Sequence, residues 1–400
     1  MKVKIYKSRA KGTVLAPPSK SAAHRMLICA ALAGKGAVVE GIAYSKDILA
    51  TLDCISAMGI EYERIGSRIS FYEKNESTAT ERTFNCNESG STLRFFIPLA
   101  LCDGCKTVFQ GSERLMSRPL DVYREIFDAQ GIRYNLDSTS LTLEGRLAPG
   151  VYNIKGNISS QFITGLLLAL PLVGGGEINI IPPVESRPYI DMTVQAMEMF
   201  GVKVEKLGEN SYKVNGNYSP CHAIVEGDHS NAAFLDAFGF IGGDVNVTGL
   251  TPESLQGDKI YKEYFERIKQ GYCTLDISNT PDLGPVLMAM GAVFEGVELT
   301  GTARLKIKES DRGEVMKSVL SEFSVATEVM DDRIIVKGRM LHPPSRPLDG
   351  YNDHRIVMSE ALLLSLTGGE ITGAQAVSKS YPDFFDIIEE LGIKIERSEP

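Results

Sequence analysis

The 400-residue sequence predicts a mixed α/β (α+β) fold with two similar lobes, each made of three repeated segments. Two observations predict this fold. An amphipathic helix followed by a short segment of alternating apolar residues recurs six times along the chain. A second helix, apolar on most of its faces, lies between successive copies.

The recurring segment has the form seen in K-D-I-L-A-T-L-D-C-I-S-A-M-G-I-E-Y-E. Apolar residues at i, i+3, i+4 and i+7 predict a helix with one buried face, and I-E-Y-E or V-K-V-E predicts a strand. The residue between helix and strand is expected to be a left-handed helix end. These marker residues are Gly59, Gly131, Gly201, Gly271, Ser324 and Gly392. Most intervals between them are close to 70 residues, and only the fourth is shorter.

The second helix of each copy is predicted to be buried, because a helix that is apolar on most faces normally has protein on most faces. These helices are expected at residues 21–34, 91–102, 159–173, 230–240, 281–294 and 354–368. Six copies divide into three and three, with the break near Glu226–Asp228. One lobe is therefore predicted at 18–228, and the other at 1–17 plus 229–400. The strand at 2–8 can pair with either half, and we assign it to the second lobe. Ligands favour clefts between such lobes, so a cleft is expected there.

Composition excludes several classes of protein. With 43% apolar and 23% charged residues, the chain is typical of a globular protein, and its net charge of −9 argues against a general nucleic-acid binder. Neither a signal peptide nor a membrane-length apolar run is apparent, so we expect a cytoplasmic protein without a membrane partner. Seven scattered cysteines favour reduced thiols. The C-x-x-C at Cys102 and Cys105 has no second ligand pair, so no metal is predicted.

Several predicted helices begin with polar clusters that suit an anion. Lys20 and Arg25 flank a serine-rich helix start, where cations oppose the helix dipole unless an anion binds. The stretch N-E-S-G-S-T-L-R-F-F at 87–96 has two interpretations: an anion site, or a capped helix with Glu88 in its first turn. Taken alone, this stretch favours capping.

Basic residues gather at the starts of elements or in turns, although the protein is acidic overall. They are Lys20, Arg25, Arg118, Arg187, Lys308, Arg312, Arg355 and Lys379. The implied ligands carry several negative charges, which suggests two polyanionic substrates together. Asp282 and Glu309 lie among these cations. Ordinary ion pairing and acid–base catalysis both remain open for them at this point.

Nine motifs together resemble the 5-enolpyruvylshikimate-3-phosphate synthase family, and they occur in the family's order from Pro17 to Phe385. They read P-P-S-K-S-x-x-H-R, S-G-S-T-x-R, R-x-x-S-R-P, S-S-Q-F, S-R-P-Y, P-D, K-E-S-D-R, D-H-R and K-S-Y-P-D-F-F. The resemblance implies two lobes, each of three βαβαββ-type units. It also implies transfer of the enolpyruvyl group of phosphoenolpyruvate to the 5-hydroxyl of shikimate 3-phosphate, with release of phosphate. This reaction belongs to the shikimate pathway to chorismate and aromatic amino acids. A monomer without metal or organic cofactor, and sensitivity to glyphosate, are expected.

The resemblance also implies residue roles. Asp282 matches the base that faces the 5-hydroxyl, and Glu309 matches the acid, assisted by Lys20. The phosphoenolpyruvate set is Lys20, Gly90, Arg118, Gln161, Arg312, Arg355 and Lys379. The shikimate-phosphate set is Ser21, Arg25, Ser159, Ser160, Ser186, Tyr189 and Lys308. His354 is expected to orient the turn at 353–355, and Gly90 to leave room for a ligand.

The chain departs from the family pattern at Glu88 and Arg304, where many members carry Asn. We expect Glu88 to point away from the ligand or to contact a cation. One rival function is the reaction of the sister enzyme, transfer of the enolpyruvyl group to UDP-N-acetylglucosamine. That enzyme usually carries a reactive Cys in a mobile loop and a first motif of the K-N-A type. Here residues 111–119 contain no Cys, and the first motif reads S-K-S. Another rival is a two-lobe anion-binding protein without chemistry, which would have no use for Asp282 and Glu309.

Overall fold

The structure, a computed structural model, describes residues 1–74, 80–338 and 340–398. Its contacts divide the chain into two compact units. One, the 20–226 unit, is Lys20–Glu226, and the other, the 227–400 unit, joins Met1–Ser19 to Gly227–Pro400. Each unit has its own hydrophobic core. No helix in the described part of the chain is long and apolar enough to cross a membrane.

The 20–226 unit contains three sheets with one topology. In the second, β6 and β7 are parallel, while β9 lies antiparallel between β7 and β8. Helices follow the first two strands of this sheet, which gives the order βαβαββ. Its elements are β6 (Glu81–Asn87), α3 (Gly90–Ala100), β7 (Lys106–Gly111), α4 (Glu113–Met116), α5 (Asp121–Gln130), β8 (Arg133–Leu136) and β9 (Ser140–Glu144).

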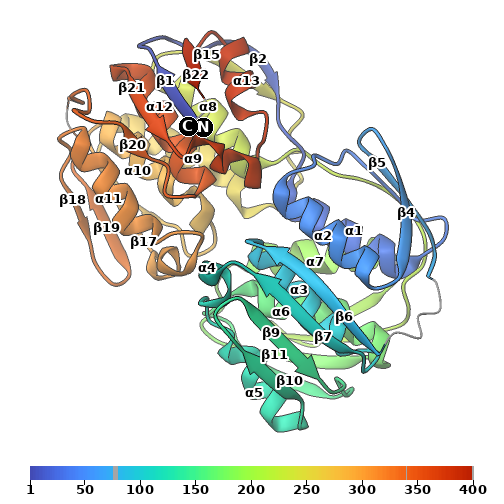
Figure 1. Ribbon diagram of the computed structural model, residues 1–400. Helices are drawn as coiled ribbons and strands as arrows, with labels where there is room; N and C mark the ends of the chain where they lie inside the picture. Colours follow the sequence, from blue (N-terminus) through green and yellow to red (C-terminus); the bar gives the residue numbers. More distant parts are fainter. Residues whose placement is uncertain (75–79, 339, 399–400) are drawn as a thin grey trace. The chain divides into compact units, whose positions relative to one another are not determined.

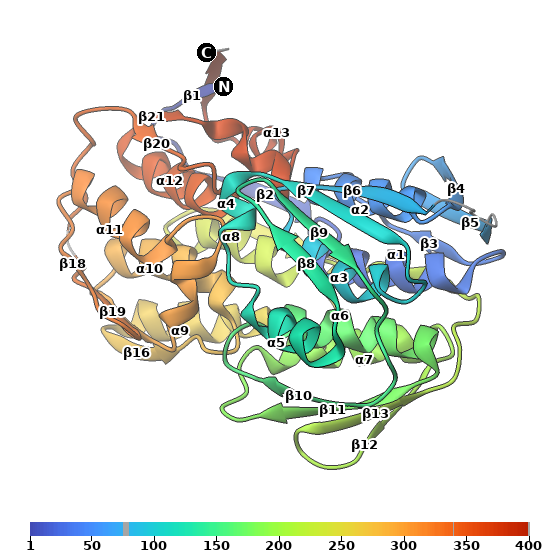
Figure 2. The ribbon, with the colours of Figure 1, turned by 60° about the horizontal axis from the view of Figure 1, so that its bottom comes forward.

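The third sheet repeats this arrangement, and Figure 2 shows α6 and α7 lying along one face of it. Its elements are β10 (Val151–Lys155), α6 (Ser160–Ala169), the 3₁₀ turn η1 (Leu170–Val173), β11 (Gly176–Ile181), α7 (Arg187–Met199), β12 (Lys203–Lys206) and β13 (Ser211–Asn215). The first sheet takes its leading strand from the far end of the unit, because β14 pairs in parallel with β3. Its elements are α1 (Lys20–Ala33), β3 (Val38–Glu40), α2 (Lys46–Ala57), β4 (Ile60–Ile65), β5 (Arg68–Lys74) and β14 (His222–Ile224).

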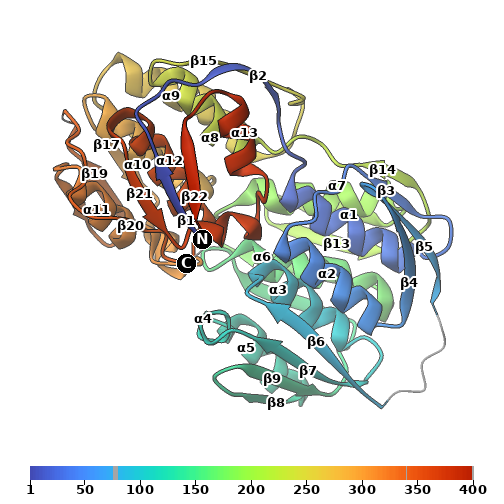
Figure 3. The same cartoon turned by 45° about the horizontal axis from the view of Figure 1, so that its top comes forward.

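The 227–400 unit holds two further four-stranded sheets of this type. Its last sheet is completed by the N-terminal strand, since Lys2 pairs with both Thr372 and Ser398. Figure 3 shows β1 between β21 and β22. The elements of these sheets are β1 (Lys2–Ile5), β16 (Cys273–Asp276), η3 (Pro281–Leu283), α10 (Gly284–Val293), β17 (Val297–Thr300), η4 (Ala303–Ile307), α11 (Arg312–Glu322), β18 (Thr327–Val329), β19 (Arg333–Val336), β20 (Leu348–Asp349), α12 (His354–Thr367), β21 (Gly369–Thr372), η5 (Ala374–Lys379), α13 (Phe384–Glu390) and β22 (Ile395–Ser398).

The fourth repeat is shorter than the others and explains the short interval in the sequence. Its sheet has two parallel strands in the described chain, which lie side by side at the top of Figure 1, and its outer helix is followed directly by β16 of the next repeat. Its elements are β2 (Lys11–Leu15), α8 (His229–Phe240), β15 (Asp244–Thr248), η2 (Gly257–Ile260) and α9 (Tyr261–Gln270).

All six buried helices are confirmed, with most residues of α1, α3, α6, α8, α10 and α12 removed from solvent. The prediction of left-handed helix ends is correct at Gly59, Gly131, Gly201 and Gly392, and Ser324 also adopts φ 64°. It is wrong at Gly271, where φ 140° and ψ −175° lie outside the αL helix-end region, in a positive-φ conformation that is open mainly to glycine. The chain continues there into β16, so it makes no reversal.

Candidate active site

The helix starts of the 20–226 unit surround the buried guanidinium of Arg25 on α1. Its Nε donates to Thr193 Oγ1 at 2.8 Å, its Nη1 to the Ser21 carbonyl at 2.6 Å and its Nη2 to the Tyr189 carbonyl at 3.1 Å. The Tyr189 and Phe95 rings lie 5.8 and 5.3 Å from the guanidinium carbon. Burial lowers the pKa of Arg25 to about 10, so the group remains charged at neutral pH.

The start of α6 brings the predicted serines and Gln161 together. Ser159 caps the helix by accepting from the Gln161 backbone N–H, and Ser160 is buried in the first turn. Gln161 accepts from Arg94 Nη1 at 2.8 Å and donates to Ser91 Oγ at 3.0 Å. Arg94, which is 2% exposed, therefore links the starts of α3 and α6. Ser186 precedes α7 with φ 54°, three residues before Tyr189.

Gly90 is the first residue of α3, and the structure explains why a side chain is excluded there. An added Cβ would lie 2.5 Å from Nη1 of Arg118 and 3.0 Å from its Cζ. The Arg118 guanidinium thus packs directly on the helix start. That Gly90 leaves room for a ligand stays a prediction, since the group next to an added Cβ here is the Arg118 side chain. Ser89 caps α3 by accepting from Thr92 N–H.

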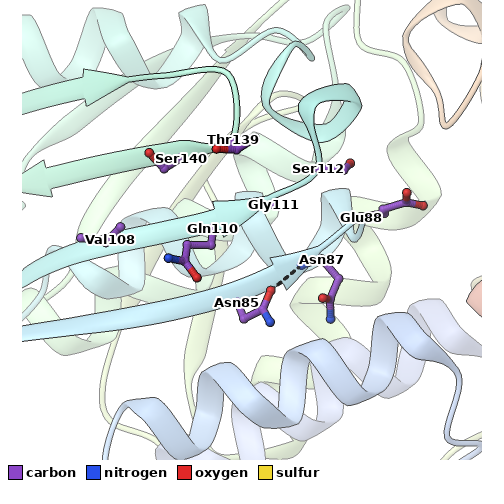
Figure 4. Close-up of a pocket in the computed structure, with 9 residues that line it drawn as sticks. All are labelled: Asn85, Asn87, Glu88, Val108, Gln110, Gly111, Ser112, Thr139 and Ser140. Atoms are coloured by element: carbon purple, nitrogen blue, oxygen red, sulfur yellow. Dashed lines mark hydrogen bonds between the residues drawn. The ribbon is translucent and has the colours of Figure 1, made fainter.

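Glu88 lies on the rim of a polar hollow of about 530 Å³ beside the start of α3. Figure 4 shows its carboxylate directed away from the carboxamides of Asn85 and Asn87. The hollow is lined by Asn85, Asn87, Glu88, Val108, Gln110, Gly111, Ser112, Thr139 and Ser140. The capping interpretation of 87–96 is therefore correct for Ser89, and Glu88 lies outside the first turn.

The 227–400 unit gathers the predicted acids and cations into one cluster. Asp282 Oδ1 lies 2.8 Å from Arg312 Nη1 and 3.1 Å from Lys308 Nζ, and Oδ2 accepts from Arg355 Nη2 at 3.2 Å. Glu309 Oε2 accepts from Arg312 Nη2 at 2.8 Å. The two acids thus share one guanidinium, which is 1% exposed.

Asp353, which is fully buried, anchors this cluster from the start of α12. It accepts from Arg312 Nε at 2.9 Å, from Ser310 Oγ at 3.0 Å and from the Arg355 backbone N–H at 3.0 Å. His354 is buried beside it, with Nδ1 3.8 Å from Asp353 Oδ1. Lys379 donates to the Asn352 carbonyl and so reaches the same turn.

The charged groups in this cluster shift one another's pKa values. Burial alone would raise the pKa of Asp282, but Arg355, Lys308 and Arg312 hold it well below its usual range. Burial lowers the pKa of Lys308, and Asp282 opposes this. Asp258 at the η2 turn is buried near Asp282, and burial together with that neighbour raises its pKa to about 7.

Sequence reasoning missed four buried charged residues around these groups: Asp47, Arg94, Asp258 and Asp353 were assigned no role. Asp47 Oδ2 lies 2.9 Å from Lys20 Nζ. A first-turn acid facing a helix-start cation was the available signal for Asp47, and the arginine of S-G-S-T-x-R was the signal for Arg94.

Two further arginines singled out in the sequence donate to backbone carbonyls. Arg304, where many family members carry Asn, is buried and donates to the Ser278 carbonyl. Arg187 donates to the Glu209 carbonyl in the turn between β12 and β13.

No cluster of three or more His, Cys, Asp or Glu side chains suited to a metal ion occurs among the described residues. The seven cysteines are free thiols.

Comparison with known proteins supports the resemblance seen in the motifs. The family model described as EPSP synthase (3-phosphoshikimate 1-carboxyvinyltransferase) matches residues 5–388. The chain is 38% identical over 424 residues to the 3-phosphoshikimate 1-carboxyvinyltransferase of Clostridium novyi, covering 98% of this chain and 97% of the relative. It is 37% identical over 418 residues to that of Clostridium acetobutylicum, with the same coverage.

Solved structures share the fold. An EPSP synthase from Acinetobacter baumannii matches with a TM-score of 0.78 and 23% identity over the whole of both chains. The enolpyruvyl transferase NikO from Streptomyces tendae also gives 0.78, at 14% identity, over 100% of this chain and 99% of that one. These likenesses confirm the predicted fold class of mixed helices and sheets in repeated units.

Proposed function

The chain belongs to the EPSP synthase family, and from this premise we propose how its residues carry out the family's reaction. The enzyme is a transferase that moves the enolpyruvyl group of phosphoenolpyruvate to shikimate 3-phosphate in the shikimate pathway. The observation that carries the residue assignment is the shared guanidinium of Arg312, which holds Asp282 and Glu309 at 2.8 Å each. A protein that only bound anions would gain nothing from two acids among its cations.

Addition followed by elimination accounts for the residue types. The substrate's 5-hydroxyl oxygen attacks C2 of phosphoenolpyruvate while Asp282 takes the hydroxyl proton. Glu309, assisted by Lys20, gives a proton to the methylene carbon, so that C3 becomes a methyl group in a tetrahedral intermediate. Elimination then returns a proton from C3 to Glu309 as the C–O bond to phosphate breaks, and the proton taken by Asp282 leaves with the phosphate. No cofactor is required by this sequence of proton transfers.

The remaining residues are proposed to bind the charged groups of the two substrates, which carry two phosphates and two carboxylates. Cations and preorganised N–H donors stabilise such groups and the charge that develops in the transition state. The proposed phosphoenolpyruvate set is Lys20, Gly90, Arg118, Gln161, Arg312, Arg355 and Lys379. The proposed shikimate-phosphate set is Ser21, Arg25, Ser159, Ser160, Ser186, Tyr189 and Lys308.

Both compact units are proposed to be domains that act on the same pair of substrates, since each contributes members to both sets. The enzyme is further proposed to be a cytoplasmic monomer. Glyphosate is proposed to compete with phosphoenolpyruvate for its residue set.

The test is phosphate release from phosphoenolpyruvate by the purified chain, with two acceptors compared. Shikimate 3-phosphate is expected to support turnover together with formation of an enolpyruvyl ether, whereas UDP-N-acetylglucosamine is expected to support none. Turnover with UDP-N-acetylglucosamine alone would overturn the proposal in favour of the sister reaction. Binding of shikimate 3-phosphate without phosphate release would favour a non-catalytic anion-binding protein.

A further inference from the structure

A largely buried ion pair joins α1 to α2 in the 20–226 unit. Lys20 Nζ lies 2.9 Å from Asp47 Oδ2, and the two side chains are 14% and 12% exposed. Lys20 is the first residue of α1, where the helix dipole disfavours a cation, and Asp47 is in the first turn of α2, where it favours an acid. Exposed ion pairs constrain side chains weakly, but a pair shielded from water fixes the position of both charges.

The same face of α2 is hydrogen-bonded to α3. Thr51 lies one turn after Asp47, and its Oγ1 is 2.8 Å from Thr92 Oγ1 and 2.7 Å from His24 Nδ1. Thr92 Oγ1 also lies 2.7 Å from Ser89 Oγ, the cap of α3. His24, Thr51, Ser89 and Thr92 are each at most 1% exposed.

This chain of hydrogen bonds ends beside the groups proposed to bind phosphoenolpyruvate. Ser89 directly precedes Gly90, against which Arg118 packs. The Asp47 backbone carbonyl accepts from Thr92 Oγ1 at 3.4 Å, so Asp47 touches Lys20 through its side chain and α3 through its backbone. The network is uncharged apart from the ion pair, because burial lowers the pKa of His24 well below its usual value and keeps the ring neutral.

We propose that Asp47 is a positioning residue for phosphoenolpyruvate, holding Lys20 Nζ in fixed register with the α3 start that carries Gly90. The proposal rests on the proposed role of Lys20. Asp47 acts through Lys20 rather than by contacting substrate. Arg25, the central cation of the shikimate-phosphate set, has hydrogen-bond partners on α1, α6 and α7. Loss of Asp47 therefore weakens the binding of phosphoenolpyruvate and leaves the binding of shikimate 3-phosphate unchanged.

The test is a set of α2 variants assayed for both Michaelis constants. Asp47→Asn keeps the shape of the side chain but removes its charge, and it is expected to raise KM for phosphoenolpyruvate about tenfold, the effect of losing one charge-assisted contact. KM for shikimate 3-phosphate is expected to stay within about twofold. Asp47→Glu restores the charge and is expected to recover most of the loss. Asp53→Asn, an exposed acid on the same helix, is the matched control and should behave as wild type.

Thr51→Val provides a second variant that leaves the ion pair intact but removes the hydrogen bond between the Thr51 and Thr92 hydroxyls, one of the two contacts described between α2 and α3. It is expected to raise KM for phosphoenolpyruvate by a smaller factor than Asp47→Asn does. If Asp47→Asn does not fold, Thr51→Val alone tests the proposed positioning role. Equal increases of both Michaelis constants, or no increase in either variant, would overturn the proposal. Failure of the wild-type chain to turn over shikimate 3-phosphate would instead refute the proposed function, so the two failures are distinguishable.

Discussion

The two units are built from the same repeat, yet Arg25 of one unit and Arg312 of the other, both buried, have opposite kinds of partner. In the 20–226 unit, Arg25 is hydrogen-bonded to neutral oxygens, which are threonine hydroxyls and backbone carbonyls. In the 227–400 unit, Arg312 is held by three carboxylates, Asp282, Glu309 and Asp353. One scaffold therefore supports both a site with excess positive charge and a site where the charges are balanced.

The difference separates two tasks. Neutral partners leave the charge of Arg25 uncompensated, which suits attraction of a phosphate. Burial would lower the pKa of Arg312, but Asp353, Glu309 and Asp282 raise it, so this guanidinium stays charged and organises acids. We infer that the 20–226 unit mainly binds and orients substrate anions, and that the 227–400 unit mainly moves protons.

The largest expected effect comes from removing the acid–base groups. Asp282→Asn and Glu309→Gln are each expected to lower kcat at least about a hundredfold, because general acid–base catalysis contributes on this order. Each is expected to stay folded, since the side-chain shape is kept. Steady-state kinetics and circular dichroism check this, and near-normal turnover of both variants would refute the assigned roles.

Removing the central cation of the 20–226 unit should affect binding instead. Arg25→Ala is expected to raise KM for shikimate 3-phosphate by tenfold or more, since at least one charge-assisted contact worth about 1.4 kcal/mol is lost. The measurement is KM for each substrate, with Arg124→Gln as control because Arg124 is an exposed arginine. A fall in kcat at saturating shikimate 3-phosphate, with no change in KM, would contradict the division of tasks.

A smaller effect is expected at the start of α3. Gly90→Ala places a Cβ 2.5 Å from Arg118 Nη1, so the guanidinium must shift. KM for phosphoenolpyruvate is expected to rise several-fold, with KM for shikimate 3-phosphate unchanged. Gly150→Ala is the matched control, because nothing lies within 4 Å of its added Cβ. An unchanged KM for phosphoenolpyruvate in Gly90→Ala would show that the position of Arg118 is unimportant.

The smallest effect concerns stability in the 227–400 unit, where one acid is buried away from cations. Glu360 on α12 is 0% exposed, and burial together with Asp349 raises its pKa well above the usual value. The folded state therefore binds this proton more tightly than the unfolded state, whose glutamate pKa is about 4.3, and stability is lost as pH rises above that value.

Glu360→Gln removes this proton linkage. The free energy of unfolding of the variant, relative to wild type, is expected to increase between pH 5 and pH 8, because only the wild-type protein loses the stability linked to this proton over that range. Urea denaturation at both pH values measures it. Parallel pH dependence of the two proteins would show that Glu360 does not titrate on unfolding.

The sequence predicts the repeats and buried helices because their signals are local: apolar spacing and a terminal glycine determine each helix. It also identifies the acids and cations at helix starts. What it does not predict is pairing between distant segments. Two charged residues, Asp47 and Arg94, find their partners only when α2 packs on α1 and α6 packs on α3. The unusual conformation at Gly271 likewise reflects the two-stranded sheet of the fourth repeat, as seen in the described residues, after which the chain enters β16 directly.

The most direct test of proton transfer by the 227–400 unit is incorporation of solvent deuterium at C3 of phosphoenolpyruvate, followed by NMR with shikimate 3-phosphate in D₂O. Wild type is expected to exchange these protons, because protonation of C3 is reversible. Glu309→Gln is expected to exchange at least about a hundredfold more slowly. Arg25→Ala is expected to exchange at nearly the wild-type rate once shikimate 3-phosphate is saturating. Exchange by Glu309→Gln at the wild-type rate would contradict the account.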